Sequence, residues 1–498
     1  MEGRSSGILL PVSALPGPYG GGTLGKHARQ FVEFLAQAGQ RYWQILPLVP
    51  PGGGESPYMS PSSFAGNPLY LDPELLAQDG LLTEEEVQSA RYPGSPDRVD
   101  YVWLHETRPP LLRKAWERGK TKYAPELAAF WKAEADWLSD FTFFLALREH
   151  FGGAELKEWP APVRKREPEA LAPLREKLAE EIKYHAFLQM LFFKQWTALR
   201  EYAHEKGVSI IGDLPIYVSP DSAEVWGDPK LFLLDKDLVP AAEAGVPPDA
   251  FSETGQHWGN PLYDWKYHKR TGFAWWKRRC AHVARLYDVV RIDHFRAFHT
   301  YWSIPAGAKD AREGHWEKGP GMPLLKALQE VEGLELIAED LGDLDGAARA
   351  FIAKSGLPGM KILVYAFDPV GESSYLPHNC PVNAIAYTGT HDTPTFVQWL
   401  FEEASEAERQ YAFEYLRLRE DEGFGWGGIC GAWMSPCRLA IAPMQDLLGL
   451  GADARMNAPG TMGPENWSWR VREAALNPDV AGRMRHITRT YRRTGSFS

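Results

Sequence analysis

Cysteine is scarce in this sequence, and long hydrophobic runs are absent. Only four of the 498 residues are cysteine, and their spacing fits neither a disulfide framework nor a zinc ribbon. We therefore expect reduced thiols and a cytoplasmic location. No apolar run approaches the roughly 18 residues of a membrane helix. The N-terminal segment carries Glu2 and Arg4, and prolines break its apolar stretch, so it does not predict a signal peptide.

Basic residues are too few to suggest a nucleic-acid partner. Lys and Arg total 54 against 65 Asp and Glu, which gives a net charge of −11 with no basic block to offset it. Phosphate-binding loops are absent too, since no Gly-x-Gly-x-x-Gly follows the first predicted strand and no P-loop occurs. Tryptophan, by contrast, is abundant: most of the 19 should lie in the core, but such an excess can also line a sugar cleft.

The sequence contains a series of short apolar runs. Eight of them are continuous rather than alternating, which is typical of parallel strands buried on both faces. They lie at 7–10, 42–47, 208–213, 289–293, 334–339, 360–367, 384–387 and 438–443. Helical patterns precede several of them, over 26–38, 186–205 and 271–287. This alternation predicts an α/β fold, a closed (β/α)₈ TIM barrel, with an open doubly wound sheet as the alternative.

Uneven spacing between these runs predicts large insertions into a single catalytic barrel that spans residues 1–498. Loops of such length need secondary structure of their own. We expect a mainly helical subdomain over 54–205, between the second and third strands. A second subdomain, with an active-site lid, is expected over 219–288, and a third insertion over 395–437.

Four acidic residues lie where predicted strands end. They are Asp213, Asp293, Glu339 and, after a short turn, Asp392. One acid at a strand end can simply cap the next helix. Catalytic groups of a barrel, however, come from the C-terminal ends of different strands, and crowded carboxylates need a metal, a cation or a positive transition state nearby. The four acids therefore indicate an active site.

The residues themselves leave two interpretations open. In one, three carboxylates hold a divalent metal, as in enolase-type barrels. In the other, one carboxylate attacks a sugar carbon while another protonates the leaving oxygen. Arg291 favours the second, because it lies two residues before Asp293 and can keep that carboxylate ionised. His294 and His391 adjoin two of the acids and are either sugar-binding or structural histidines.

Three strings resemble the catalytic motifs of a known family: VRIDHF at 290–295, AEDLG at 338–342 and TGTHD at 388–392. This family is the amylomaltases, which are 4-α-glucanotransferases (disproportionating enzymes) of the α-amylase clan. The string FSETGQHWGNP at 251–261 is a further, highly specific match. Shorter matches at 56–58, 212–216, 357–361 and 466–470 extend the resemblance over nearly the whole chain.

The resemblance implies a role for each candidate residue. Asp293 is the expected nucleophile, Glu339 the general acid/base, and Asp392 the third carboxylate, which supports the transition state, while Arg291 orients Asp293. Substrate contacts are expected from Tyr58, Asp213, Glu253, Trp258, His294 and His391, with 251–258 as a lid over the acceptor side and 455–466 closing from the other. Many members carry Asn after the His-Asp pair, whereas this chain has Thr393.

The function implied is transfer of α-1,4-glucan segments between maltooligosaccharides or starch, by a retaining double displacement. The expected partners are a glucan donor and a sugar acceptor such as glucose, with no nucleic acid, no membrane, no metal and no cofactor. A hydrolase of the same clan is one alternative. A metal-dependent enolase-type lyase and a non-catalytic glucan-binding protein are the others.

Overall fold

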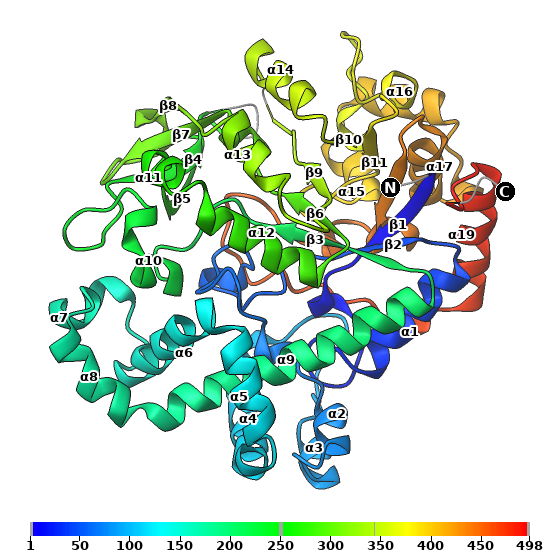
Figure 1. The fold of residues 1–498 in the computed structure, drawn as a ribbon. Helices are drawn as coiled ribbons and strands as arrows, with labels where there is room; N and C mark the ends of the chain where they lie inside the picture. The colour runs from blue at the N-terminus through cyan, green and yellow to red at the C-terminus, as the bar shows by residue number, and fades with distance from the viewer. Residues whose placement is uncertain (1–2, 249–251, 343, 496–498) are drawn as a thin grey trace.

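The computed structural model describes residues 3–248, 252–342 and 344–495, and an eight-stranded parallel sheet forms its centre (Figure 1). The strands follow one another in the order β10-β11-β12-β1-β2-β3-β6-β9. The N–H of Ala338 donates to the carbonyl of Pro358 at 2.9 Å, which brings the two ends of this order together. The sheet is therefore a nearly closed barrel, as the sequence predicts. Its strands are β1 (Ser5–Leu9), β2 (Tyr42–Gln44), β3 (Ser209–Leu214), β6 (Val289–Ile292), β9 (Leu336–Ala338), β10 (Gly359–Ile362), β11 (Ala384–Tyr387) and β12 (Leu439–Pro443).

All eight predicted strands are present, but the second, fifth and sixth are shorter than predicted, the sixth most of all. β10 ends at Ile362, and the rest of the apolar run forms a 3₁₀ turn, η8 (Leu363–Tyr365), where a strand to 367 was predicted. Leu363 and Val364 are buried in this turn as they would be in a strand. A short apolar run does not distinguish a buried strand from a buried turn, which explains the error.

Alternation along the strands positions the polar groups of the barrel. Ile211, Val289 and Ile337 belong to one buried cluster, together with residues of the other barrel strands. Two residues after each of them in the sequence lie Asp213, Arg291 and Glu339, respectively. Side chains in a strand point to the same face every second residue. These polar groups therefore lie on the same face as the apolar cluster, closer to the C-terminal end of the barrel.

Helices cover the outside of the barrel (Figure 1). Trp275 and Trp276, on the helix α12 (Ala274–Leu286) that precedes β6, are 5% and 0% exposed and pack in the core. The covering helices include α1 (Lys26–Gln37), α9 (Ala179–Glu205), α12 (Ala274–Leu286), α13 (Met322–Leu328), α14 (Gly346–Ser355), α17 (Phe424–Met434) and α19 (Pro478–Thr490). No helix of the described ranges is both long enough and apolar enough to span a membrane.

A group of helices is inserted between β2 and β3, at the lower left of Figure 1. Its last helix, α9, runs back to the barrel and leads into β3. The insertion begins with short 3₁₀ turns. Its helices before α9 are α2 (Pro73–Gln78), α3 (Glu84–Ser89), α4 (Tyr101–Lys122), α5 (Ala124–Ala133), α6 (Ala135–His150), α7 (Ala161–Arg164) and α8 (Pro168–Lys177).

A second, four-stranded antiparallel sheet stands beside the barrel in the order β5-β4-β7-β8. The sequence did not reveal it, because its strands are short, partly polar and come from both sides of β6 in the chain. They are β4 (Ala242–Val246), β5 (Gln256–Pro261), β7 (Thr300–Pro305) and β8 (His315–Lys318). Between β3 and β6 also lie α10 (Ala223–Gly227) and α11 (Trp265–Arg270), and between β11 and β12 lie α15 (Phe396–Gln398), a π-helical turn (Trp399–Glu403), α16 (Glu406–Leu416) and α17.

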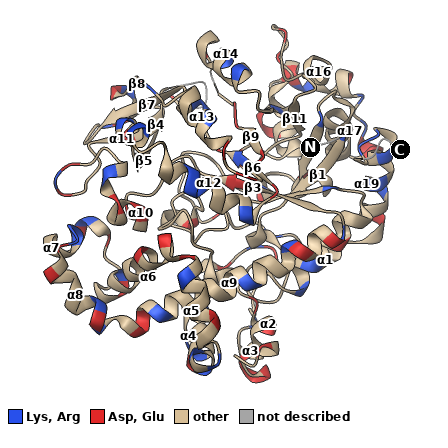
Figure 2. Ribbon diagram, viewed as in Figure 1, with Lys and Arg blue, Asp and Glu red and all other residues tan. Residues whose placement is uncertain are grey.

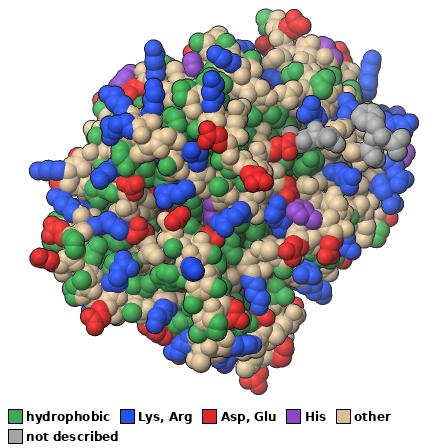
Figure 3. Space-filling model, viewed as in Figure 1, with side chains coloured by type: hydrophobic (Ala, Val, Ile, Leu, Met, Phe, Trp, Pro, Cys, Tyr) green, Lys and Arg blue, Asp and Glu red, His purple; other side chains and the backbone are tan. Residues whose placement is uncertain are grey.

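Charged residues of both signs are distributed over the covering helices (Figure 2). The face seen in Figure 3 shows the same mixture, with lysine and arginine side chains interspersed among acidic ones. Acidic residues also occur near β3 and β6, at the centre of the molecule, where the predicted active site lies (Figure 2).

Candidate active site

A cavity of about 820 Å³ opens at the C-terminal ends of the barrel strands. Asp293, Glu339 and Asp392 all line it, so the structure brings together the three predicted carboxylates. Four more of the predicted site residues also line it: Tyr58, Trp258, Arg291 and His294. Asp213 accepts hydrogen bonds from Tyr58 and Arg291, and His391 forms an ion pair with Asp392. Glu253, by contrast, lies on an exposed turn and does not line the cavity. Residue 251, the first of the expected lid, lies outside the described residues.

Arg291 joins two of the carboxylates. It stands opposite Asp213 in the β3–β6 register, and its Nη1 donates to both carboxylate oxygens of Asp213 at 2.8 Å. Its Nη2 donates to Oδ1 of Asp293 at 3.1 Å. Burial alone disfavours the charged guanidinium, but Asp213 and Asp293 hold the pKa of Arg291 well above its ordinary value. The side chains of Arg291 and Asp213 are 4% and 0% exposed, so this ion pair is buried.

Asp293 follows β6 directly, and its N–H donates to the carbonyl of Leu214 at 3.1 Å. Burial raises the pKa of its carboxyl to about 6, and the charge of Arg291 opposes that rise. The sequence predicted that Arg291 favours the ionised form, and it does. Burial nevertheless outweighs it, so Asp293 titrates close to neutrality while remaining mostly ionised at pH 7.

Glu339 follows β9 and accepts two backbone hydrogen bonds. The N–H of His294 donates to its Oε2 at 2.7 Å, and the N–H of Leu341 to its Oε1 at 2.9 Å. Burial raises the pKa of Glu339 to about 7; Arg291 and the two N–H groups lower it, and the charge of Asp293 raises it further. A large share of Glu339 therefore keeps its proton at neutral pH, as a general acid requires.

His294 is held in an unusual backbone conformation, with φ 46° and ψ 48°. Its ring packs edge-to-face against Trp258, with centroids 5.1 Å apart. Burial lowers the pKa of His294 to about 4, so the imidazole is neutral. Its Nε2 makes no hydrogen bond to any residue that the structure describes. A strained backbone and a buried ring nitrogen beside a cavity are typical of a ligand-binding residue.

Asp392 is the carboxylate that stays ionised. It follows β11 after a short turn, its Oδ2 lies 3.1 Å from Nε2 of His391, and Asn457 Nδ2 donates to its Oδ1 at 2.7 Å. Burial favours the neutral acid, but the charge and hydrogen bond of His391 and the hydrogen bond of Asn457 hold the pKa of Asp392 to about 2. The three carboxylates thus differ in proton affinity as well as in position.

Tyr58 forms one wall of the cavity. Its hydroxyl donates to Oδ2 of Asp213 at 2.6 Å and lies 2.8 Å from Nε2 of His391. Its ring is parallel to the His391 ring, with centroids 5.6 Å apart and an interplanar angle of 11°. Trp467 packs on the same tyrosine at 5.9 Å. These contacts fix the orientation of the ring against the two polar residues.

Thr393 stabilises the turn that carries Asp392. Its Oγ1 accepts a hydrogen bond from the N–H of Thr390 at 2.8 Å and lies 3.0 Å from the carbonyl of Pro394. The threonine therefore makes hydrogen bonds within its own turn. A hydroxyl thus braces the loop at this position, and Asp392 still reaches the cavity.

Several cavity residues were missed by sequence reasoning. Asn457 lies 65 residues from Asp392, in the loop expected to close over the site, and nothing local marks it as a partner of that carboxylate. Trp467 belongs to a string that matched the family, yet no role followed from the match. Arg296 and Trp316 also line the cavity. Trp316 belongs to the small sheet, which the sequence did not predict, so no signal could have placed it there.

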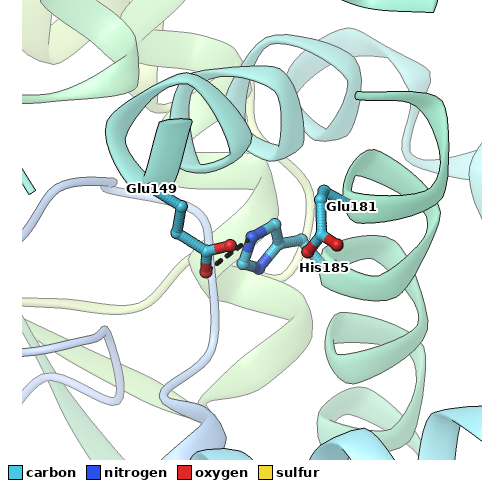
Figure 4. A group of neighbouring side chains, drawn as sticks. All are labelled: Glu149, Glu181 and His185. Atoms are coloured by element: carbon cyan, nitrogen blue, oxygen red, sulfur yellow. Dashed lines mark ion pairs between the residues drawn. The ribbon is translucent and has the colours of Figure 1, made fainter. Parts of the chain in front are cut away.

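A separate cluster resembles a metal site but already contains a cation. Glu149, Glu181 and His185, on α6 and α9, place possible ligand atoms within 4.8 Å of one another (Figure 4). Arg113 Nη2, however, lies 3.3 Å from Glu149 and also contacts Glu181. Its charge offsets part of the charge of the two glutamates and would repel a divalent ion. Arg291 has the same effect between Asp213 and Asp293.

Comparison with known proteins agrees with this geometry. A sequence model of the family described as 4-alpha-glucanotransferase matches residues 10–476. The chain is 46% identical over 495 residues to the 4-alpha-glucanotransferase of Thermus thermophilus, which covers 97% of each chain. It is 43% identical over 486 residues to that of Clostridium butyricum, which covers 97% of this chain and all of the relative.

Solved structures give the same result. The amylomaltase from Streptococcus agalactiae in complex with acarbose superposes with a TM-score of 0.95 at 43% identity, over 98% of this chain and 99% of that one. The amylomaltase from Corynebacterium glutamicum, at 20% identity and a TM-score of 0.76, shares the fold. These matches favour a transferase over the hydrolase, lyase and binding-protein alternatives. The chain belongs to the 4-alpha-glucanotransferase family.

Proposed function

We propose that this 4-alpha-glucanotransferase breaks an α-1,4 bond of a maltooligosaccharide and passes the released segment to another sugar, with retained stereochemistry. One observation carries this mechanism. Asp293 and Glu339 stand at the ends of the neighbouring strands β6 and β9, line one cavity, and have pKa values of about 6 and about 7. A retaining reaction requires one carboxylate as the nucleophile and a second carboxyl that acts first as acid and then as base.

In the first half of the reaction, Asp293 attacks the anomeric carbon of the donor sugar. Arg291 holds the attacking carboxylate in place through its Nη2 contact. Glu339 gives its proton to the glycosidic oxygen, so the leaving sugar departs as an alcohol and a glycosyl-Asp293 ester remains. Asp392, ionised and braced by His391 and Asn457, stabilises the oxocarbenium-like charge.

In the second half, Glu339 acts as the base. It takes the proton of an acceptor hydroxyl, the acceptor oxygen attacks the anomeric carbon, and Asp293 leaves as a carboxylate. Water competes for the same intermediate. Transfer therefore depends on a well-bound acceptor and on a cavity from which water is excluded, and the walls formed by Trp258 and the 459–462 loop serve that purpose.

The polar residues around the carboxylates are proposed to bind the donor sugar. His391 and Asp213 lie behind Tyr58, and His294, whose buried Nε2 has no hydrogen-bond partner among the described residues, lines the cavity with Trp258. Glu253 is proposed to reach the acceptor only when its turn moves inward, because it is exposed in this structure. We further propose a cytoplasmic location, since all four cysteines are free and a reducing compartment keeps them so.

Maltotriose alone tests the proposed reaction. Transfer should convert it into glucose plus a ladder of longer oligomers, while the total number of reducing ends stays nearly constant. Chromatography of the products with a parallel reducing-end assay measures both. An increase in reducing ends that matches the glucose released would instead identify a hydrolase.

A further inference from the structure

Two large aromatic side chains that line the cavity are exposed, Trp316 and, to a lesser extent, Tyr365. Trp316, on β8, is 40% exposed, whereas most tryptophans of this chain are buried. It lines the cavity together with Arg296. Exposed apolar surface at the rim of a binding cleft commonly marks a contact for a ligand. None of the three carboxylates contacts this residue, so the chemical step leaves it without a role.

The indole of Trp316 is fixed by its neighbours. The guanidinium of Arg296 lies 3.9 Å from the ring centroid, in a cation–π contact. On the adjacent strand β7, Trp302 stands directly opposite in register and packs edge-on, with centroids 5.0 Å apart. Trp302 is in turn held by a hydrogen bond from its Nε1 to the carbonyl of Ala311 at 2.8 Å. A ring held in this way loses little entropy when a sugar binds to it.

Arg296 links Trp316 to the chain segment that follows Glu339. This arginine is three residues beyond Asp293 and pairs, at 3.4 Å, with Asp345, which follows Glu339 in the chain. Tyr58, by contrast, packs against His391 on the Asp392 side. In Figure 1 the small sheet with β8 and the strand β11 that leads to Asp392 lie on opposite sides of β6 and β9.

The role of Glu339 indicates which part of the substrate Trp316 would contact. Glu339 protonates the leaving oxygen and later deprotonates the acceptor, so the acceptor chain must extend from the site on the Glu339 side. We propose that Trp316 is the stacking platform of a distal acceptor subsite, which binds a glucosyl unit beyond the one whose hydroxyl attacks. Arg296 and Asp345 supply polar groups at its edge. The proposal rests on the role given above to Glu339.

This subsite makes the enzyme select acceptors by length. Free glucose fills only the position next to Glu339 and gains nothing from Trp316. A longer maltooligosaccharide reaches the indole and places the C–H face of a pyranose on it. Contact with an aromatic ring of this kind is worth a factor of about three to ten in affinity.

The test uses Trp316→Ala and Trp316→Phe in the full-length enzyme. Maltosyl fluoride serves as the donor, and the KM is measured separately for glucose and for maltotetraose as acceptors. Trp316→Ala should raise the KM for maltotetraose about three- to ten-fold and leave the KM for glucose within two-fold. Trp316→Phe keeps an aromatic face and should recover most of the loss. Met434→Ala, which removes an apolar side chain of similar exposure (43%) outside the cavity, should change neither KM.

The results separate this subsite from the proposed function. If the unmodified enzyme transfers to both acceptors but Trp316→Ala changes neither KM, or changes both equally, the subsite is wrong and the mechanism stands. If the unmodified enzyme transfers to neither acceptor, the proposed function fails and the subsite fails with it. Transfer to glucose at the normal rate shows that Trp316→Ala is folded, and thermal unfolding confirms it.

Discussion

Two buried carboxyls of different proton affinity face the same cavity. Burial raises both pKa values, to about 6 for Asp293 and about 7 for Glu339, but only Asp293 contacts Arg291 directly. Because the charge of Arg291 favours the ionised form of Asp293 most directly, the state with Asp293 ionised and Glu339 protonated is favoured over the reverse. This is the state in which a nucleophile and a general acid can act together.

The first prediction assigns these two roles by mass spectrometry. In Glu339→Gln the proton donor is lost but the nucleophile remains. Maltosyl fluoride has a good leaving group that needs little protonation, so it should still glycosylate Asp293. The intermediate should then persist, because no base activates the acceptor. Intact-protein mass spectrometry should show a sugar adduct, and peptide mapping should place it on Asp293.

Asp293→Asn is the matched control for this trap. It should bind glucan, form no adduct and lose several orders of magnitude of activity. An adduct on another carboxylate, or the same adduct in Asp293→Asn, would show that a different residue is the nucleophile.

The second prediction concerns pH. As pH falls below about 6, Asp293 gains a proton and the nucleophile is lost; as pH rises above about 7, Glu339 loses its proton and the acid is lost. The profile of kcat/KM for maltotriose should therefore be a narrow bell with limbs near these values. In Glu339→Gln, glycosylation by maltosyl fluoride should keep the acidic limb and lose the alkaline one. An alkaline limb that survives this substitution would belong to another group.

At the scale of single elements, strand β3 contributes adjacent residues to the active site and to the contact between the barrel and helix α12. Asp213 points into the barrel, while the preceding residue, Gly212, faces outward against Tyr287 at the end of α12. A Cβ added at Gly212 would lie 2.1 Å from Cδ2 of Tyr287. The strand can approach the helix this closely only because Gly212 has no side chain.

Gly212→Ala should therefore destabilise the protein and disturb the site together. Overpacking of this kind costs about 1–3 kcal/mol, and any shift of β3 moves Asp213 away from Arg291. Urea unfolding should show the lower stability, and activity per folded molecule should fall as well. Gly346→Ala is the control, because a Cβ at this first residue of α14 meets nothing within 4 Å. If Gly212→Ala is as stable as the control, the close contact with Tyr287 does not require a glycine at position 212.

At the scale of the whole molecule, the sequence predicted the barrel better than the shape of its cavity. The eight apolar runs and the period of two in β3, β6 and β9 were sufficient to place the carboxylates on one rim, because these rules are local. The bond from Asn457 to Asp392 and the position of Trp316 depend on contacts between distant segments. No spacing in the chain encodes such contacts, so they could be found only in three dimensions.

The last prediction is that activity needs no metal. Acidic residues gather at two places, the barrel rim and the Glu149–Glu181–His185 cluster, and either could suggest a divalent ion (Figure 4). Each already contains an arginine in contact with two carboxylates, Arg291 at the rim and Arg113 in the cluster. A fixed guanidinium offsets part of the negative charge without a metal and raises the electrostatic cost of adding one.

Exhaustive dialysis against a chelator should therefore change neither the rate of maltotriose disproportionation nor the midpoint of thermal unfolding. The two readouts test the two places separately, because the cluster lies in the helical insertion and the rim holds the reacting groups. Loss of activity that magnesium or calcium restores would place an ion at the rim and overturn the double-displacement scheme. A lower unfolding midpoint with normal activity would place the ion in the insertion and leave the chemistry of Asp293 and Glu339 intact.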